Sequence, residues 1–399
     1  MKLDFESLFM RITLITSERL NEFPPVITLL STLERLGHEV TYITPYRDID
    51  FDNLGLCRAR HLFCAGAPDE KLTRYYSNRY AASAAFHTER ILRSHYIRQI
   101  PTKFRAELDR ADVVWVLHEN TFLLGGKRFA DNLGDYLYTM YELCIKNGRV
   151  PEIYEYAARK AKLAVVPEYN RAHIAKAYYA LPHLPAIIPN KPLDHPRERN
   201  LPISDPVIAA KIDQLKQNGK KIVMYMGILS SERPLEPVIE AVNQTDAYVL
   251  AVLGGRTPYL DRLEKQMGDR FVYLGAVKPP HHLEVASHAD VAYISYVANN
   301  RSINAVFCAP NKVYEFAGFG IPMLCNDNPG LKYTVEYYGM GICAEDLSAE
   351  TIRKSLEQIS QEESSMSQAA IRYYEAENVE AAVADTINRY MKIKEGKQL

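Results

Sequence analysis

The sequence has little tryptophan, few cysteines and no long apolar run. One Trp and six Cys occur among 399 residues, and no two cysteines form a C-x-x-C motif. A disulfide framework and a cysteine-based zinc site are therefore not expected, and we predict reduced thiols in a cytoplasmic protein. No apolar run approaches the roughly 18 residues that a membrane-spanning helix needs. Residues 1–9 include acidic side chains and no long apolar stretch, so they do not resemble a signal peptide.

An excess of charge of either sign is also missing. The 48 basic and 49 acidic side chains give a formal net charge of -1, so no nucleic-acid partner is expected. No G-x-G-x-x-G motif follows any strand-like segment, which argues against a nicotinamide-dependent dehydrogenase. The length and the 47% of hydrophobic residues instead predict a globular protein of two or three domains.

The first half of the chain alternates between strand and helix patterns. Arg11–Thr16 is a continuous strand-like run, Pro25–Leu36 has apolar residues at helical spacing, and Glu39–Thr44 is a second strand-like run. Gly37 lies between the helix and the second strand, where a helix commonly ends. This βαβ order predicts a parallel sheet covered by helices. Further strands are expected at Ala111–Leu117, Tyr136–Tyr141 and Leu163–Val166.

A proline-rich stretch interrupts this alternation, which then restarts. Five prolines lie between Ile188 and Pro206, and this composition is typical of a linker between domains. The fold class is therefore predicted to be α/β, with two Rossmann-like doubly wound domains facing a cleft. The predicted parts are an N-terminal domain over 1–190, a linker over 191–206, a C-terminal domain over 207–377, and a helix over 378–399 that crosses back to the first domain. In the second half we expect strands at Lys221–Met226, Ala247–Leu253, Phe271–Leu274, Val291–Ile294 and Pro322–Cys325, with helices at Pro234–Val242, Tyr259–Met267, His281–Ala286 and Pro310–Gly318.

The segment Met226–Pro234 (MGILSSERP) joins a strand to a helix and carries candidate ligand-binding residues. Gly227 ends the strand, and Arg233 stands just before the expected helix. The free N–H groups at the start of a helix suit a phosphate, and an arginine can bind two phosphate oxygens at once. An ordinary strand-to-helix loop with a solvated arginine is the alternative.

The segment Ala309–Pro322 (APNKVYEFAGFGIP) predicts a short helix with a polar side. Pro310 suits the first turn of a helix, and Asn311, Lys312 and Glu315 follow it. A carboxylate at this position can accept two hydrogen bonds from a diol such as a ribose. The alternative is that Lys312 and Glu315, three residues apart, form a surface ion pair worth only a few tenths of a kcal/mol.

Two other strand ends carry weaker candidates. Gly254 and Gly255 follow a strand and would let a ligand approach the backbone closely, although a plain tight turn explains them equally well. His118 follows the strand ADVVWVL, where polar residues line the ligand cleft of such folds, but a single histidine is more often structural.

Taken in order, these segments resemble the retaining glycosyltransferases of family 4, which have the GT-B fold. The similarity spreads over most of the chain and is strongest from about residue 221 to 345. GILSSERP is similar to the family's "G-R-L-S-x-x-K-G", which puts Arg233 where the family has a phosphate-binding lysine. PNKVYEFAGFGIPML is similar to the family's nucleotide-sugar helix, in which Glu315 matches the glutamate that holds the ribose. FVYLGAV, which ends at Val277, matches a segment whose backbone frames the base.

The sequence departs from the family at three points. Phe307 stands where the family has the first glutamate of its Glu-x7-Glu signature, and Ile228 replaces the arginine of its first motif. Ser17–Pro25 (SERLNEFPP) replaces the glycine-rich loop after the first strand. These departures leave the identity of the donor sugar open and favour, as one alternative, a catalytically degenerate subunit that only binds nucleotide.

The resemblance implies a retaining hexosyltransferase that takes a sugar from a UDP- or GDP-sugar, with no metal and no cofactor. His118, Arg233 and Lys312 are the expected catalytic residues. Gly227, Arg233, Gly254, Gly255, Val277, Asn311, Lys312 and Glu315 are expected to bind the donor nucleotide. The expected acceptor is a glycan or a polyprenyl-linked molecule in polysaccharide synthesis. A nucleotide-sugar 2-epimerase on the same fold is the other alternative.

A basic segment suggests where such an acceptor, or a membrane surface, would bind. Residues 58–110 hold nine Arg and two Lys against three Glu and two Asp, which gives 11 − 5 = +6, with tyrosines between them. Such a segment can contact anionic lipid, which would place the protein in the cytoplasm at the inner face of the membrane. A solvated helical face is the equally favoured alternative.

Overall fold

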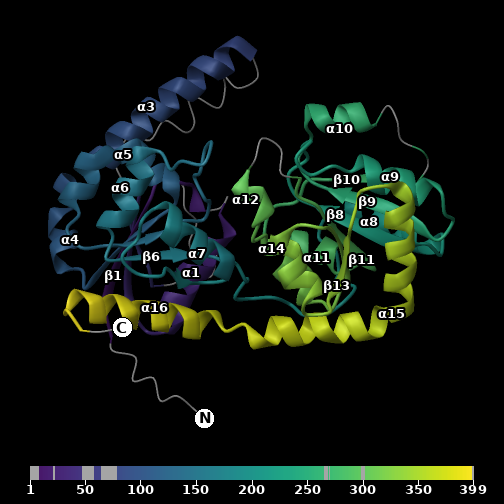
Figure 1. Ribbon diagram of the computed structural model, residues 1–399. Helices are drawn as coiled ribbons and strands as arrows, with labels where there is room; N and C mark the ends of the chain where they lie inside the picture. The colour runs from purple at the N-terminus through teal and green to yellow at the C-terminus, as the bar shows by residue number, and fades with distance from the viewer. Residues whose placement is uncertain are drawn as a thin grey trace. The chain divides into compact units, whose positions relative to one another are not determined.

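The computed structural model describes residues 9–20, 23–46, 58–63, 79–264, 268, 270–297 and 302–397, without the side chains of 79–87 (Figure 1). The chain divides into two compact units. The N-terminal unit comprises Met1–Pro189 and Asn378–Leu399, and the C-terminal unit comprises Asn190–Glu377. Residues 64–78 of the basic segment and the end of the expected helix Tyr259–Met267 lie outside the described residues.

The N-terminal unit is built on a seven-stranded parallel sheet of order β3-β2-β1-β4-β5-β6-β7. Its strands are β1 (Arg11–Thr16), β2 (Glu39–Thr44), β3 (Arg60–Phe63), β4 (Val113–Leu117), β5 (Leu137–Thr139), β6 (Leu163–Val166) and β7 (Ala186–Ile187). Its helices are α1 (Pro24–Arg35), α3 (Arg79–Lys103), α4 (Arg105–Arg110), α5 (Glu119–Asn132), α6 (Glu152–Lys160), α7 (Tyr169–Tyr178) and α16 (Val379–Lys394). The strand order reverses between β1 and β4, which is where ligands bind in doubly wound sheets.

The C-terminal unit is built on a six-stranded parallel sheet of order β10-β9-β8-β11-β12-β13. Its strands are β8 (Lys221–Met226), β9 (Tyr248–Leu253), β10 (Phe271–Gly275), β11 (Val291–Ile294), β12 (Met323–Asn326) and β13 (Gly341–Ala344). Its helices are α8 (Pro206–Gln217), α9 (Glu236–Asn243), α10 (Pro258–Leu263), α11 (His282–Ala286), α12 (Ile303–Val306), α13 (Asn311–Ala317), α14 (Pro329–Leu331) and α15 (Ala349–Ala376), and a π-helical turn spans Lys332–Glu336. Here the strand order reverses between β8 and β11.

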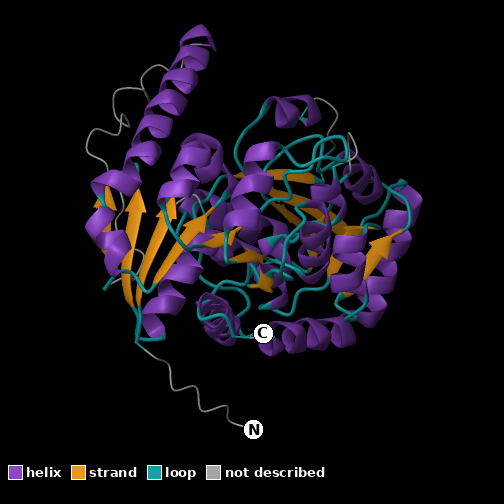
Figure 2. Cartoon of the chain, turned by 60° about the vertical axis from the view of Figure 1, so that its left-hand side comes forward, coloured by secondary structure: helices purple, strands orange, loops and turns teal. Residues whose placement is uncertain are grey.

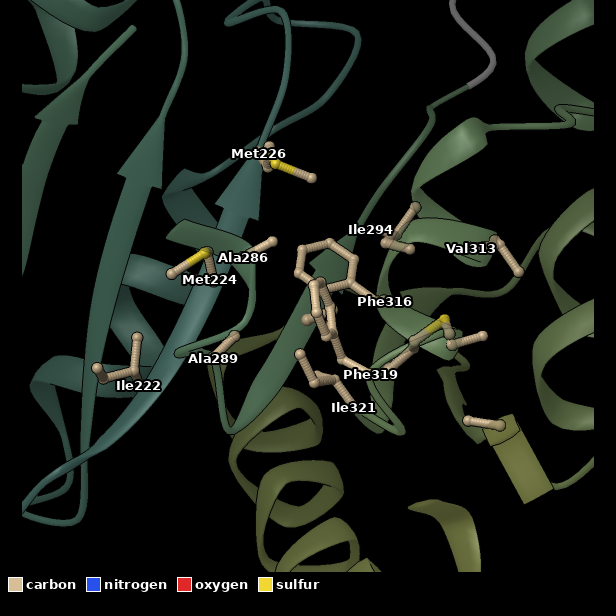
Figure 3. Packing of buried hydrophobic residues seen from close by; sticks show 14 of the residues in the cluster. Ile222, Met224, Met226, Ala286, Ala289, Ile294, Val313, Phe316, Phe319 and Ile321 are labelled. Carbon is tan, nitrogen blue, oxygen red and sulfur yellow. The ribbon is translucent and has the colours of Figure 1, made fainter. Parts of the chain in front are cut away.

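Each sheet is a layer between helices, and this burial explains its sequence (Figure 2). Alternate residues of β8 enter two separate apolar clusters. Ile222 and Met224 join Phe316 of α13 on one face of the sheet, whereas Val223 and Tyr225 join the other face. Figure 3 shows the first of these clusters at close range. Because both faces of a parallel sheet are buried, its strands are continuous apolar runs rather than alternating ones.

The proline-rich stretch packs on the C-terminal unit. The Lys191 ammonium donates hydrogen bonds to the carbonyls of Tyr374 and Glu377, both at 2.6 Å. Arg197 reaches the carbonyl of Gly318, and Arg199 reaches that of Ala289. These bonds fix the start of the unit against the ends of α13 and α15.

The last helix, α16, belongs to the N-terminal unit. Its residues Val379, Val383, Ile387 and Tyr390 enter the same apolar cluster as Trp115 of β4. It packs beside α1, as Figure 1 also shows, and the Lys394 ammonium donates to the carbonyl of Asp112 at 3.0 Å. Among the described helices, none combines the length and the apolar character that crossing a membrane requires.

Candidate functional site

The end of β8 and the start of α13 meet at one point in the C-terminal unit. Gly227 follows β8 with φ 144°, a conformation that residues other than glycine rarely adopt. A Cβ at Gly227 would lie 2.6 Å from Cε and 3.1 Å from Nζ of Lys312. Glycine is therefore needed here for two reasons, because it provides the backbone angle and leaves room for the lysine side chain.

Glu315 lies on α13 and is buried, with only 6% of its surface exposed. Its Oε1 stands 3.2 Å from Nε2 of His282, the first residue of α11. Glu315 Oε2 and His282 Nδ1 are buried and have no hydrogen-bond partner among the described residues. The surface ion pair between Lys312 and Glu315 that the spacing alone allows is therefore wrong, because Glu315 lies inside the protein and pairs with a histidine.

The charge of Glu315 depends on its neighbours. Burial by itself raises the pKa of this carboxyl, but His282, Lys312 and His195 together lower it below its ordinary value. Glu315 is therefore ionised at neutral pH, although it is buried. A buried carboxylate with one unbonded oxygen has an unmet capacity to accept hydrogen bonds, and leaving a buried acceptor unpaired costs about 1–3 kcal/mol.

Arg233 belongs to the same cluster. Its guanidinium lies over the ring of Tyr296, 4.9 Å from the ring centroid, and its Nε is buried without a partner among the described residues. Burial lowers the pKa of Lys312; the charge of Glu315 opposes this effect, and that of Arg233 adds to it. Lys312 therefore interacts electrostatically with both Arg233 and Glu315, and through it the structure brings these three predicted site residues together. We call Arg233, Lys312, Glu315 and His282 the charged cluster.

Hydrogen bonds from the backbone and from the Asn326 side chain hold the loops that carry this cluster. The Val297 N–H donates to the Glu232 carbonyl at 2.8 Å, which ties the Arg233 loop to the segment after β11. Asn326 accepts from the Tyr296 N–H and donates to the Tyr296 carbonyl, at 2.8 and 3.0 Å. Tyr296 is thus fixed beneath the Arg233 guanidinium at the edge where the strand order reverses.

Not every predicted donor-site residue has a ligand-facing role in this geometry. Gly254 packs against the backbone, since a Cβ there would lie 2.2 Å from the Gly227 carbonyl oxygen. Gly255 faces open space, and Asn311 opens α13 next to Lys312. Val277 is partly buried and packs against the apolar cluster of Figure 3.

A prediction follows from the two glycines. Gly254→Ala is expected to lower the free energy of unfolding by about 1–3 kcal/mol, the usual cost of overpacking, because β8 and β9 must separate. Urea denaturation measures this change. Gly255→Ala, its neighbour in open space, should stay within about 0.5 kcal/mol of the parent protein. Equal effects of the two substitutions would contradict the packing described here.

The helix expected to hold a phosphate begins later than predicted. The pattern predicted Pro234–Val242, but α9 begins at Glu236 and thus has an acidic residue in its first turn. A carboxylate already occupies this favourable position for an anion. The side chains of Arg233 and Lys312, rather than this helix opening, are therefore the available partners for a phosphate.

His118 lies in the N-terminal unit, after β4 and beside the end of β1. It has φ 72°, its Nδ1 accepts a hydrogen bond from the Asn120 N–H at 3.2 Å, and its ring meets Phe23 edge-on. Two carboxylates flank Nδ1, Glu119 at 3.4 Å and Glu18 at 3.8 Å.

Glu119 is a candidate that the sequence pattern did not single out. It is 3% exposed, its Oε1 accepts from the Glu142 N–H at 2.7 Å, and its Oε2 has no partner among the described residues. Burial raises the pKa of this carboxyl. The only signal in the sequence is its position directly after His118 at the end of a strand.

His282 was not predicted either. In the sequence it is the second of two histidines after two prolines, and it was expected only as part of the helix His281–Ala286. Its role becomes visible only when α11 and α13 pack side by side, which sets it against Glu315. Among the described residues, no group of three or more His, Cys, Asp or Glu could hold a metal ion.

Comparison with known proteins gives a fold but no family. No protein-family model and no curated protein matches the chain. Solved structures do match, among them sucrose-phosphate synthase from Thermosynechococcus elongatus, 16% identical with a TM-score of 0.64 over 97% of this chain and 100% of that one. HepE of Anabaena, in complex with UDP and glucose, is 12% identical with a TM-score of 0.63 over 97% and 99%. A Listeria monocytogenes protein described as a UDP-N-acetylglucosamine 2-epimerase is 12% identical with a TM-score of 0.56 over 98% and 98%.

These likenesses agree with the two parallel sheets. The chain has the GT-B architecture, in which two Rossmann-like α/β units follow one another along the sequence. The predicted fold class is confirmed in this respect.

Proposed function

We propose that this protein is a glycosyltransferase that takes its sugar from a nucleoside-diphosphate donor bound by the C-terminal unit. One observation carries the proposal. A buried, ionised carboxylate with an unbonded oxygen lies near Lys312, which in turn lies near Arg233, at the point where the strand order of the sheet reverses. A nucleoside diphosphate offers the complementary groups, namely a ribose diol for the carboxylate and a diphosphate for the cations.

The transfer itself needs negative charge to be stabilised on the leaving group. The bond between the sugar C1 and the diphosphate oxygen breaks, and its electron pair stays on the diphosphate. A bond forms between C1 and an acceptor hydroxyl oxygen, and the hydroxyl proton passes to an oxygen of the departing diphosphate. Arg233 and Lys312 are fixed cations that would stabilise the departing diphosphate, and such electrostatic stabilisation is usually the largest catalytic effect.

The finer parts of the proposal rest on the resemblance to the retaining family. We propose that the transferred group is a hexose, that its anomeric configuration is retained and that His118 contacts it. Arg233 and Lys312 would take the role that a divalent ion has in other transferases, so we propose that no metal is needed. The proposed acceptor is a glycan or a polyprenyl-linked molecule of polysaccharide synthesis. Cytoplasmic location, with contact to a membrane through residues 58–110, remains a prediction.

Glu315→Gln tests the proposal directly. The amide keeps the size of the side chain but loses the charge-assisted hydrogen bonds to a diol, which are worth about 1.5–3 kcal/mol. We therefore expect about 10- to 150-fold weaker binding of UDP or GDP by calorimetry. Glu284→Gln, on the neighbouring α11 and bonded to Ser204, is the matched control and should bind like the parent protein.

Two results would count against the proposed function or against the proposed role of Glu315. If folded parent protein binds neither UDP nor GDP at any salt concentration, the proposed function is wrong. If the parent binds and Glu315→Gln binds equally well, Glu315 is not in the nucleotide site.

Epimerisation of a nucleotide sugar is the second candidate, because the fold also matches the Listeria protein described as such an epimerase. The two reactions differ in what they need. An epimerase converts the nucleotide sugar alone, whereas a transferase needs an acceptor. Incubation with UDP-N-acetylglucosamine alone, followed by chromatography of the sugar, separates them. A degenerate subunit would bind nucleotide and give neither product.

A further inference from the structure

A pocket of the N-terminal unit is lined by four cations and no carboxylate. It has a volume of about 660 Å³ and lies between the end of α3, the start of α4 and the middle of α5. Its charged lining residues are Arg98, Arg105, Lys127 and Arg128. Pro101 and Phe129 give it a small apolar part.

The pocket depends on a break inside α5. Gly126 has φ 74° and ψ -178°, which interrupts the helix, and a Cβ at Gly125 would lie 2.6 Å from the Phe129 ring. The Leu124 carbonyl near this break accepts from Ser94 Oγ at 2.7 Å and from Arg98 Nε at 3.2 Å. Side chains of α3 thus hold the break open, and Lys127 and Arg128 follow it directly.

The existing partners of these cations leave their charge largely uncompensated. Lys127 pairs with Glu152 and Arg105 with Asp109, but these acids are 82% and 63% exposed. Arg105 also donates to the neutral Asn132 carbonyl at 2.6 Å, and the exposed Asp131 lies within electrostatic reach of Lys127. Exposed pairs of this kind contribute about 0–1 kcal/mol, so a better anion can replace them. The Arg128 side chain has no partner among the described residues, and Arg98 uses only Nε for the Leu124 carbonyl.

We propose that this pocket binds a phosphate or diphosphate group, independently of the donor site in the C-terminal unit. One arginine can bind two oxygens of the same phosphate group. Four cations around one pocket favour a ligand with two negative charges over a ligand with one. The group is either that of a free phosphorylated molecule or the headgroup of a lipid. The apolar floor suits a phosphate ester rather than a bare ion.

The test uses inorganic pyrophosphate as the probe. The cations of the proposed donor site are replaced first, so that pyrophosphate bound there does not contribute to the signal. In an Arg233→Gln/Lys312→Gln background, calorimetry at low salt should detect pyrophosphate binding. Adding Lys127→Gln and Arg128→Gln should weaken it at least tenfold, and salt should weaken it as well. Arg110→Gln, an exposed arginine of α4 outside the pocket, should change nothing. No binding in the background protein, or equal binding after Lys127→Gln and Arg128→Gln, would overturn the proposal.

Vesicles distinguish the two sources of the phosphate group. If phosphatidylcholine vesicles with phosphatidic acid sediment the protein, and Arg128→Gln or pyrophosphate releases it, the ligand is a lipid headgroup. If pyrophosphate binds and these vesicles do not, the ligand is a free phosphorylated molecule. If the protein sediments with these vesicles to the same extent after Arg128→Gln and in the presence of pyrophosphate, the pocket has no role at a membrane.

Discussion

Replacing Lys312 with methionine is expected to lower sugar transfer by about 10²- to 10³-fold, the usual cost of removing one stabilising group from a developing anion. The fold should not suffer. Burial, with help from Arg233, lowers the pKa of Lys312 in spite of the opposing effect of Glu315. A cation whose pKa is lower in the folded than in the unfolded protein costs folding free energy at any pH below its unfolded-state pKa, and neutral pH lies below the ordinary lysine pKa of 10.5. Methionine removes this cost, so the melting temperature should stay the same or rise.

Lys332→Met is the contrasting control. The hydrogen bond to Asp327 raises the pKa of Lys332, so this cation helps the fold below its folded-state pKa, and it lies outside the charged cluster. We expect unchanged transfer and an equal or slightly lower melting temperature. Transfer would be measured with radiolabelled donor and unfolding by calorimetry. Full activity of Lys312→Met, or a clear loss of its stability, would show that Lys312 is a structural residue.

A second large effect is expected from Val383→Asp in α16. Val383 is fully buried in the cluster that contains Trp115, and an unpaired charge there should cost about 3–5 kcal/mol. The sole tryptophan of the chain lies in the N-terminal unit, so its fluorescence reports the unfolding of that unit alone. A red shift of the emission should therefore begin at much lower urea concentration than in the parent protein.

Asn388→Asp, exposed on the same helix, introduces the same charge without burying it. Its urea midpoint should match that of the parent protein. If both substitutions shift the midpoint equally, or if neither does, α16 does not complete the core around Trp115.

The fold could be predicted from the sequence where burial is simple. Lys221–Met226 and Val291–Ile294 were predicted to the residue, because strands covered on both faces are short, continuous apolar runs. The expected strand Tyr136–Tyr141 is shorter, Leu137–Thr139, although tyrosines on both sides of it are also buried. Apolar character alone does not show where the hydrogen-bonded ladder ends.

The candidate site could be predicted only in part. The spacing of Lys312 and Glu315 is visible on one helix, and Arg233 was singled out from its place between a strand and a helix. The contact between His282 and Glu315 comes from the packing of two helices, and no local pattern encodes it. No local pattern shows the role of Gly254 either. The sequence predicted that it binds a ligand, whereas in the structure it lets the ends of β8 and β9 approach each other.

The position of α16 also has a consequence during synthesis. The side chains that close the core of the N-terminal unit follow the entire C-terminal unit along the chain. During synthesis on the ribosome, the C-terminal unit can therefore finish folding first. Until α16 has been synthesised, the sheet of the N-terminal unit keeps an apolar face exposed. A partly folded intermediate with exposed apolar surface is prone to aggregate. Expression at lower temperature, or with chaperones that shield apolar surface, should favour this protein more than one whose domains are contiguous.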